Sequence, residues 1–538
     1  MKYALLLIVV VAALYGQTFS FGYVGLDEEE LIVQRQGFLR NPANIPVIFT
    51  HDVSYPNKTS PYYRPMLTLS FMADAMIGGT SNVVAHLTNV LLHIVAVLLL
   101  WRFFIALGIE KSKSFFYSLI FAVHPVFSQA VAWVPGRNDT LLAVFVLSSC
   151  IFFLKSLRLR SWKPHAVHFA LFALALLTKE TAVVVPIIII GIWLWFSGVP
   201  FSWRRFWSYA VPWMILLVIW YAVRAHALSS IPGKSLSAML SQILGYAPQV
   251  VVYLGKIILP FQLSVMPSAG DSVIWFGLGA LIILCALVYI SRKYLRSSQV
   301  FFGACWFLSF LVPSLISYDD PSRVVFFEHR LYLPLIGVLL IFALLPGRVW
   351  KIGAPILVGF AVLAFFHVRT FRSEISFWEQ AVSSSPSMAR ARNSLGVAYA
   401  NAGRLGDAFQ EYQTAYRMTP DDYLINTSLG NAYRLRREPA LAEEHLKKAI
   451  SINPARAPAH HYLGFLYATQ KRFSEAEQEW FLALQYNSQY APPHEALAVY
   501  YAQVGRFEES IVHIRAIMEL GAPVLPELMN ILQTHQQP

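Results

Sequence analysis

The sequence contains few charged residues for its length. Only 13% of its 538 residues are Asp, Glu, Lys or Arg, whereas 56% are hydrophobic. Soluble domains carry about 25% charged residues. A chain this apolar could not cover its surface with polar groups, so a soluble globular class is excluded and we predict a membrane protein.

Cysteine is equally scarce. The three cysteines, Cys150, Cys285 and Cys305, lie far apart in apolar segments. A disulfide framework or a zinc site needs closely spaced cysteines or histidines. Neither kind of site is predicted, and no other cluster of metal-ligand spacing is present.

Long apolar runs fill the chain up to about residue 370. A hydrocarbon core of about 30 Å needs roughly 20 apolar helical residues, and we predict a polytopic bundle of about 11 such spans. The first run lacks a clear small-x-small cleavage site and is interpreted as a retained helix rather than a signal peptide. The predicted spans are 3–21, 83–107, 114–132, 139–155, 165–181, 182–198, 206–224, 272–291, 299–317, 331–346 and 352–369.

Basic loops predict the orientation of this bundle. The net charge is +12, but the basic residues are spread among loops, so nucleic-acid binding is not expected. Every even-numbered span is followed by a basic loop, which favours the cytoplasmic side. The N-terminus is then cytoplasmic, and the loop 22–82 and the C-terminal region are extracytoplasmic. Segment 246–262 is interpreted as interfacial or re-entrant. The basic residues are Lys111, Lys113, Lys155, Arg158, Arg160, Lys163, Arg204, Arg205, Arg292, Lys293, Arg296, Arg348 and Lys351.

A 34-residue pattern follows the last span. Gly396, Gly430 and Gly464 are each followed three residues later by a tyrosine, and twelve and nineteen residues later by alanines. This spacing is typical of tetratricopeptide repeats, in which small residues let paired helices cross closely. We predict an all-α fold with a membrane domain at 1–371 and an extracytoplasmic repeat solenoid at 372–538, opened by a half repeat around Trp378. Such solenoids usually bind peptide or protein; the alternative is a stabilising or oligomerising role.

Two motifs in the loop 22–82 are candidates for chemistry. Asp27, next to Glu28, could take a proton from an acceptor hydroxyl at the membrane face; the alternative is a solvated or helix-capping acidic loop. Arg64 lies between tyrosines and Pro65 and could grip a phosphate with its forked guanidinium. The alternative interpretation is that Arg64 lies at the membrane interface and extends its side chain toward the lipid headgroups.

Further polar residues lie beside apolar runs, where ionisable groups are costly unless they face a polar cavity. By the topology above, all of them lie on the extracytoplasmic side. Unrelated ion pairs would have no reason to share one face, so we predict an active site there. The additional candidates are His124, Arg137, Asp139, Lys179, Glu180, Glu328, His329 and Arg330.

These motifs, in this order, resemble the transmembrane-and-TPR-containing (TMTC) proteins, GT-C fold O-mannosyltransferases related to the protein O-mannosyltransferases. The resemblance is carried by Leu26-Asp27-Glu28, Tyr63-Arg64-Pro65, the stretch His124–Asp139, Lys179-Glu180, Arg330-Leu331-Tyr332-Leu333-Pro334 and the repeats. It implies a polyprenyl-phosphate-linked sugar, with mannose as a candidate, and a Ser or Thr acceptor on a translocated protein that the repeats recruit.

The resemblance also implies roles for individual residues. Asp27 matches the acceptor-side base and Glu28 the second acidic position. Arg64, Arg137 and Arg330, with His329, match positions that could hold the donor phosphate. Some GT-C enzymes use a divalent metal and others do not, and no cofactor is assigned.

One departure concerns Gln129, which stands where the family usually has glutamate, so an acidic or metal role is doubtful there. The chain is short with few repeats, which favours a bacterial member in the inner membrane.

We therefore expect an inverting glycosyl transfer in which Asp27 activates the acceptor. A second interpretation keeps the donor but changes the acceptor to a glycolipid, lipopolysaccharide or cell-wall polymer. A third is a non-catalytic membrane scaffold that acts through its repeats. Substitution of Asp27 separates the two enzymes from the scaffold.

Overall fold

The computed structural model describes residues 1–56, 59–79, 81–159, 161–229, 234–293, 295–316, 326–345 and 353–535. Within these ranges the chain forms helices and no strands, which confirms the predicted all-α fold. It divides into two compact units, Met1–Ser385 and Pro386–Pro538, which are described separately. The helix around Trp378 belongs to the first unit, whereas the boundary at 371/372 remains a prediction from the repeat pattern.

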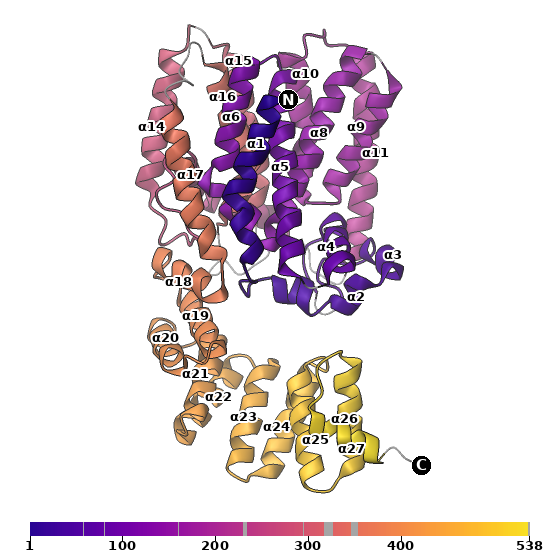
Figure 1. The fold of residues 1–538 in the computed structure, drawn as a ribbon, viewed down its shortest axis with the longest axis vertical. Coiled ribbons are helices and arrows are strands. Elements are labelled where there is room, and N and C mark those ends of the chain that lie inside the picture. The colour runs from indigo at the N-terminus through magenta and orange to yellow at the C-terminus, as the bar shows by residue number, and fades with distance from the viewer. Residues whose placement is uncertain are drawn as a thin grey trace. The chain divides into compact units, whose positions relative to one another are not determined.

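The first unit is a bundle of apolar helices that run alternately up and down (Figure 1). Its helices are α1 (Lys2–Tyr15), α2 (Gln36–Arg40), α3 (Ile45–Ile48), α4 (Pro65–Gly78), α5 (Asn82–Ala106), α6 (Lys111–Val123), α7 (Ser128–Ala132), α8 (Arg137–Leu159), α9 (Trp162–Leu176), α10 (Val185–Phe196), α11 (Trp203–Ala227), α12 (Leu236–Gly245), α13 (Ala247–Ile258), α14 (Ile274–Ile290), α15 (Ser297–Leu311), α16 (Pro334–Leu344), α17 (Ala354–Val368) and α18 (Glu374–Ser384).

Several of these helices are long and apolar enough to cross a membrane. Six pass this test in the described residues, and the bent pair α6–α7 makes a seventh. The predicted number of about 11 spans remains a prediction, since the other predicted spans overlap shorter helices. Arg160, Arg348 and Lys351, and the ends of predicted spans 299–317, 331–346 and 352–369, lie outside the described residues.

Glycines allow a close helix crossing between α15 and α16. A Cβ on Gly303 of α15 would lie 2.8 Å from the carbonyl oxygen of Gly337 in α16, and the reverse contact is closer still. Because small residues let backbones approach without a hydrophobic drive from water, this packing suits helices that lie in lipid.

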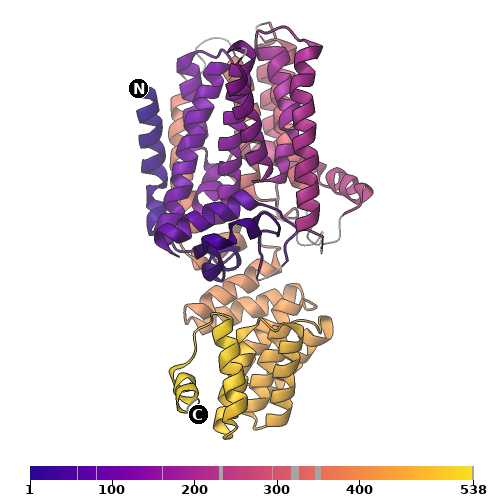
Figure 2. The ribbon, with the colours of Figure 1, turned by 90° about the vertical axis from the view of Figure 1, so that its right-hand side faces the viewer.

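Several connections between helices lie at the end of the bundle opposite the N-terminus (Figures 1 and 2). The segment that carries α2–α4 lies at the end opposite the N-terminus, as Figures 1 and 2 show. The helix α6 also ends there, because Pro125 cannot continue it and the chain bends by 51°. Leu31 and Ile32 then pack with Phe71 and Val134, so the loop after α1, the start of α4 and the α7–α8 connection share one apolar cluster.

The segment 246–262 contains the short helix α13. Its twelve residues extend about 18 Å, less than the hydrocarbon core of about 30 Å. The helix therefore cannot span a membrane by itself. It packs tightly on α14, where a Cβ on Gly255 would lie 2.7 Å from the backbone nitrogen of Gly277.

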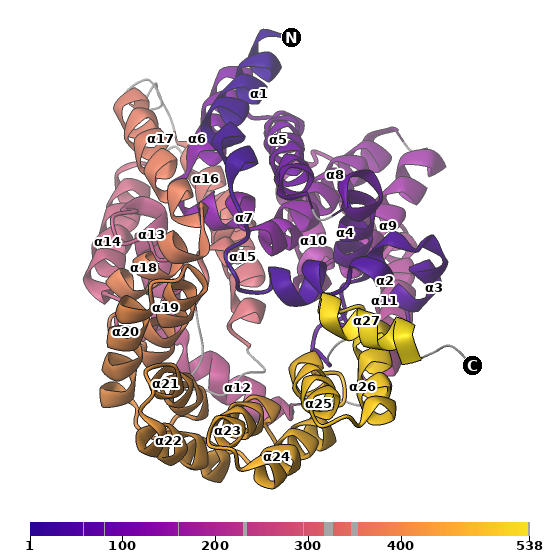
Figure 3. The same ribbon diagram turned by 60° about the horizontal axis from the view of Figure 1, so that its bottom comes forward.

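The second unit is a solenoid of paired helices along a curved path (Figure 3). A Cβ on the repeated glycines Gly396 and Gly430 would meet the side chains of Tyr412 and Leu446 in the paired helix, which confirms the predicted close crossings. Its helices are α19 (Ala389–Asn401), α20 (Leu405–Met418), α21 (Tyr423–Leu435), α22 (Pro439–Ile452), α23 (Ala457–Thr469), α24 (Phe473–Tyr486), α25 (Ala491–Gln503), α26 (Phe507–Glu519) and α27 (Pro526–His535).

Candidate active site

The acidic loop after α1 places its two candidate carboxylates in different surroundings. Asp27 is exposed, whereas Glu28 is buried and accepts a hydrogen bond from the backbone nitrogen of Leu26 at 3.1 Å. Burial, together with the neighbouring charge of Asp27, raises the pKa of Glu28 to about 7. Asp27 is thus accessible from outside the protein, whereas Glu28 is a buried, hydrogen-bonded part of the loop.

Segments far apart in sequence bring a second set of ionisable side chains together, here called the ionic cluster. Its members are Arg64 before α4, Asp139 in the first turn of α8, Lys179 and Glu180 after α9, and His329 and Arg330 in the short turn Glu328–Leu331. Lys179 Nζ lies 2.7 Å from Asp139 Oδ1, and Arg64 Nη2 lies 3.4 Å from Glu180 Oε2. His329 Nε2 lies 3.9 Å from Asp139 Oδ2.

The ionic cluster carries an excess of positive charge. Three cations, Arg64, Lys179 and Arg330, face two carboxylates, and all three act electrostatically on His329. Burial and these positive charges hold the pKa of His329 well below its usual range, so its imidazole is neutral at pH 7. The net charge of the cluster is then about +1.

Some hydrogen-bonding groups of the ionic cluster are left without a partner. Within the described residues, the buried Arg64 Nε and Arg330 Nη1 have no hydrogen-bond acceptor. An unsatisfied buried donor costs about 1–3 kcal/mol, and more when it is charged. Guanidinium groups suit forked binding of phosphate, so an anionic ligand would satisfy these donors.

Gln129 fastens the segment that carries His329 and Arg330. Its side-chain oxygen accepts hydrogen bonds from the backbone nitrogens of Glu328 and His329 at 3.1 and 3.4 Å. Its amide nitrogen donates to the carbonyl oxygen of Val265 at 3.2 Å. The surroundings of this side chain thus require both a hydrogen-bond donor and an acceptor. An amide supplies both, whereas an ionised carboxylate only accepts.

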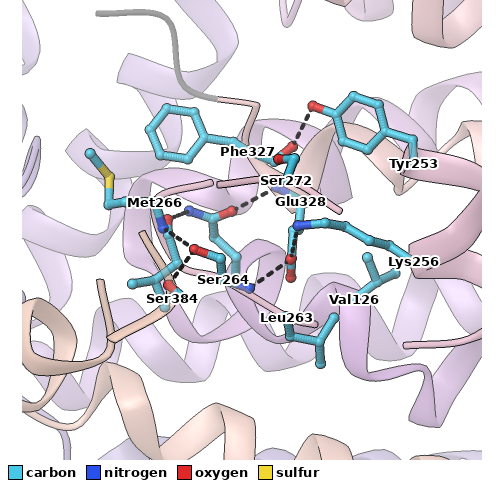
Figure 4. Close-up of polar contacts among 12 residues, drawn as sticks. Val126, Tyr253, Lys256, Leu263, Ser264, Met266, Ser272, Phe327, Glu328 and Ser384 are labelled. Carbon is cyan, nitrogen blue, oxygen red and sulfur yellow. Dashed lines mark hydrogen bonds and ion pairs between the residues drawn. The ribbon is translucent and has the colours of Figure 1, made fainter. Parts of the chain in front are cut away.

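Glu328 forms a buried ion pair beside the ionic cluster. Its Oε1 lies 2.6 Å from Lys256 Nζ and accepts from the backbone nitrogen of Ser264 at 2.8 Å (Figure 4). His367 Nε2 lies 3.7 Å from its Oε2. Burial would raise the pKa of Glu328, but Lys256 and His367 outweigh it and lower the pKa below the usual range.

Helix α18 is bound to the same loop by side chains. Gln380 accepts from the backbone nitrogen of Val265 at 3.0 Å and donates to the carbonyl oxygen of Leu263 at 3.0 Å. Ser385 donates to the carbonyl oxygen of Met266 at 2.7 Å. Just before α18, the backbone oxygen of Arg372 accepts from Gly22 at 3.1 Å. This helix therefore supports both the acidic loop and the loop under Glu328.

Two candidates from the stretch His124–Asp139 lie in other surroundings. Arg137 is fully buried and pairs with Asp74 at 2.6 Å, while its remaining N–H groups bond Asn89, Ser70 and the carbonyl of Ala85. His124 Nε2 lies 2.9 Å from the carbonyl oxygen of Ile257. Neither side chain joins the ionic cluster, and both contact protein groups that explain their burial.

Sequence reasoning missed several partners of these residues. Asp74 and Lys256 are single charges inside apolar helices, a pattern that itself indicates a buried partner. Ser264, Gln380 and His367 gave no such signal, because serine, glutamine and histidine lie near loops and on short helices in most proteins without a special partner. Among the ranges described, no group of three or more His, Cys, Asp or Glu side chains is placed to hold a metal ion.

Two family profiles match parts of the chain. Residues 61–223 match the family described as dolichyl-phosphate-mannose-protein mannosyltransferase. Residues 376–423 and 427–492 match the tetratricopeptide repeat. The first match includes four members of the ionic cluster, and the second covers most of the predicted repeats.

The chain is also similar to curated proteins. It is 36% identical to the protein O-mannosyl-transferase TMTC2 of Mus musculus over 21% of this chain and 13% of that protein. It is 24% identical to the protein O-mannosyl-transferase F38B6.6 of Caenorhabditis elegans over 66% of this chain and 54% of that protein. These matches confirm the resemblance to the TMTC proteins, although the aligned region spans about half or less of each relative's length.

Solved structures match the chain over about a third of its length or less. The crystal structure of MamA covers 28% of this chain and 86% of its own, at 18% identity and a TM-score of 0.24. A tetratricopeptide protein of Thermus thermophilus covers 34% and 95%, at 22% identity and a TM-score of 0.27. Scores this low carry no argument about function.

Proposed function

We propose that this chain is an integral membrane O-mannosyltransferase that uses a polyprenyl-phosphate-linked donor and inverts the anomeric centre. The match to the mannosyltransferase family and the named relatives support the transfer of mannose. The observation that carries the mechanism is the convergence of Arg64, Lys179 and Arg330 with buried N–H groups that lack acceptors.

The ionic cluster would hold the donor phosphate. Arg64 and Arg330 point unsatisfied guanidinium donors into it, and Lys179 adds a point charge that Asp139 fixes in place. As the glycosidic bond breaks, negative charge grows on the phosphate oxygen. Fixed cations stabilise that charge more in the transition state than in the ground state. His329 is neutral and would donate or accept a hydrogen bond without adding charge. Arg137 is left out of this proposal, because its donors already have protein acceptors.

Asp27 would act on the acceptor. Its exposed carboxylate takes the proton from a Ser or Thr hydroxyl, and the oxygen attacks the anomeric carbon from the face opposite the phosphate. The bond between the anomeric carbon and the phosphate oxygen breaks, and its electron pair leaves with the polyprenyl phosphate. Glu28 is the buried neighbour that holds the loop.

The proposal includes an orientation and a role for the repeats. The end of the bundle that carries the acidic loop and the ionic cluster would face the extracytoplasmic side of a bacterial inner membrane, where translocated proteins emerge. The tetratricopeptide repeats would recruit the acceptor protein.

Transfer by the purified chain tests the proposal. The full-length protein in detergent is incubated with polyprenyl-phosphate mannose and peptides from secreted proteins, and glycopeptides are detected by mass spectrometry. We expect transfer by the wild type and its loss, by a factor of about 10² or more, in Asp27→Asn with an unchanged melting temperature. Glu29→Gln, an exposed neighbour in the same loop, is the matched control and should retain activity.

Each other result points to a different function. Consumption of donor with glycolipid or glycan acceptors, but none with peptides, would keep the donor chemistry and replace the acceptor. Transfer that survives in Asp27→Asn would remove this residue from the reaction. A folded protein that consumes no donor with any acceptor would leave a scaffold that works through its repeats.

A further inference from the structure

A polar cavity is lined by Lys256 and by no member of the ionic cluster. Its volume is about 340 Å³, near the lower end of small-molecule sites. Its walls come from α13, the loop 261–273, the start of α14 and the end of α18. Figure 4 shows the polar contacts of three residues that line it, Lys256, Ser264 and Ser384.

Eight of the eighteen residues that line the cavity carry hydroxyl or amide side chains. They are Ser264, Ser268, Ser272, Ser383, Ser384, Ser385, Gln262 and Gln380. Hydroxyls and amides both donate and accept hydrogen bonds, so they complement ligands whose own groups do the same. The wall is also rigid, because Gln380 holds the backbone on both sides of Ser264 and Ser384 Oγ lies 2.6 Å from Ser264 Oγ.

The two charged side chains of the wall already have partners. Lys256, its cation, pairs with Glu328 at 2.6 Å. Asp271, its carboxylate, accepts from Ser268 at 2.6 Å. A phosphate would find no cation in excess and would meet the negative charge of Asp271. The electrostatics therefore favour an uncharged ligand.

An aromatic surface completes the cavity. Phe261 is 66% exposed, and its ring lies 6.5 Å from that of Phe276, which also lines the cavity. An exposed aromatic ring beside hydroxyls and amides offers an apolar face and a polar face to one ligand. A pyranose has the same division, since its ring carbons present C–H groups and its edges present hydroxyls.

We propose that the cavity between α13, α14 and α18 binds a neutral hexose unit. The C–H face of the sugar packs on Phe261, and its hydroxyls bond the serine and glutamine side chains of the wall. The hexose could belong to a free saccharide or to a glycan on a protein, and both present the same chemistry. Binding here needs no transfer reaction and does not depend on the activity proposed above.

Saturation-transfer NMR on the full-length protein in detergent tests this site. The probes are methyl α-mannoside, methyl α-glucoside, an O-mannosylated peptide and the same peptide without sugar. We expect saturation transfer to at least one methyl hexoside, and to the sugar protons of the glycopeptide if the cavity also accepts protein-linked glycans. The plain peptide should neither show transfer nor compete.

Variants assign the signal to the cavity. Ser383→Trp fills it from an exposed position on α18 and should reduce the signal to the level of a protein-free sample. Ala269→Trp is the matched control, because Ala269 is exposed in the same loop but does not line the cavity. Phe261→Ala should weaken the signal, and melting temperatures verify that all variants fold.

Three results would overturn the proposal. The first is no saturation transfer to any sugar from the folded wild type. The second is a signal that persists in Ser383→Trp but disappears in Arg330→Gln, because the sugar then sits in the ionic cluster. The third is competition by the plain peptide, which would make the cavity a peptide site. Since Asp27→Asn should bind sugar normally, loss of transferase activity alone would leave this inference intact.

Discussion

Lys179 Nζ lies 2.7 and 2.8 Å from the two carboxylate oxygens of Asp139, and both side chains are more than 90% buried. This pair joins the start of α8 to the residues that follow α9. Because it neutralises both charges where water is scarce, it fixes the position of Lys179 in the ionic cluster.

Replacing one partner of this pair should lower the free energy of unfolding more than replacing both partners. We expect Lys179→Met alone to lower stability by about 3–5 kcal/mol, because Asp139 is left buried without its partner. The double variant Lys179→Met with Asp139→Leu should recover much of that loss. Thermal unfolding in detergent measures both. Equal losses for the single and double variants would mean that the pair is not buried as described.

Glu28 should make stability depend on pH. Its pKa rises from 4.5 to about 7 on folding, mainly by burial, so the folded state binds the proton more tightly. The contribution of this group to the free energy of unfolding is full below pH 4.5. It falls by about 3 kcal/mol as the pH rises through 7. Glu28→Gln cannot ionise and should exceed the wild type in stability at pH 8. Parallel melting curves for the two proteins between pH 4 and pH 8 would contradict this.

Replacing Gln129 with glutamate should lower the stability of this chain. Gln129→Glu keeps an acceptor for the backbone nitrogens of Glu328 and His329 but loses the donor to Val265. The carboxylate would face the carbonyl oxygen of Val265, at a cost of about 1–3 kcal/mol. Denaturation of the two proteins side by side measures the difference. A variant as stable as the wild type would show that the Val265 hydrogen bond contributes little.

Arg137 and Arg330 should respond differently to substitution. Arg137→Met removes the partner of the buried Asp74 and should lower stability by about 3–5 kcal/mol. Arg330→Gln should leave the fold intact and raise the KM for the polyprenyl-phosphate donor. Melting temperature and donor titration, measured on both proteins, separate the two effects. A stable Arg137→Met variant with weakened donor binding would return Arg137 to the phosphate site.

The sequence was sufficient for the all-α class and the repeat solenoid, because helical periodicity and the 34-residue repeat both appear directly in the order of apolar and small residues. It also indicated that Lys179, Glu180, His329 and Arg330 would share one end of the bundle, since the order of the spans determines where each loop lies. Positions along a chain do not show which acceptors surround an arginine, however. Arg64 and Arg137 looked alike in sequence, and only the packing distinguishes the unsatisfied guanidinium of the first from the saturated one of the second.

The hydrogen bonds made by α18 and its flanking residues form late in synthesis of the chain. The loop under Glu328 is fastened by Gln380 and Ser385, and the acidic loop by the backbone of Arg372. These residues follow α17 in the sequence, so a nascent chain that ends at α17 still lacks them. The loop 263–266 and the acidic loop therefore gain these hydrogen bonds only after residues 372–385 have left the ribosome.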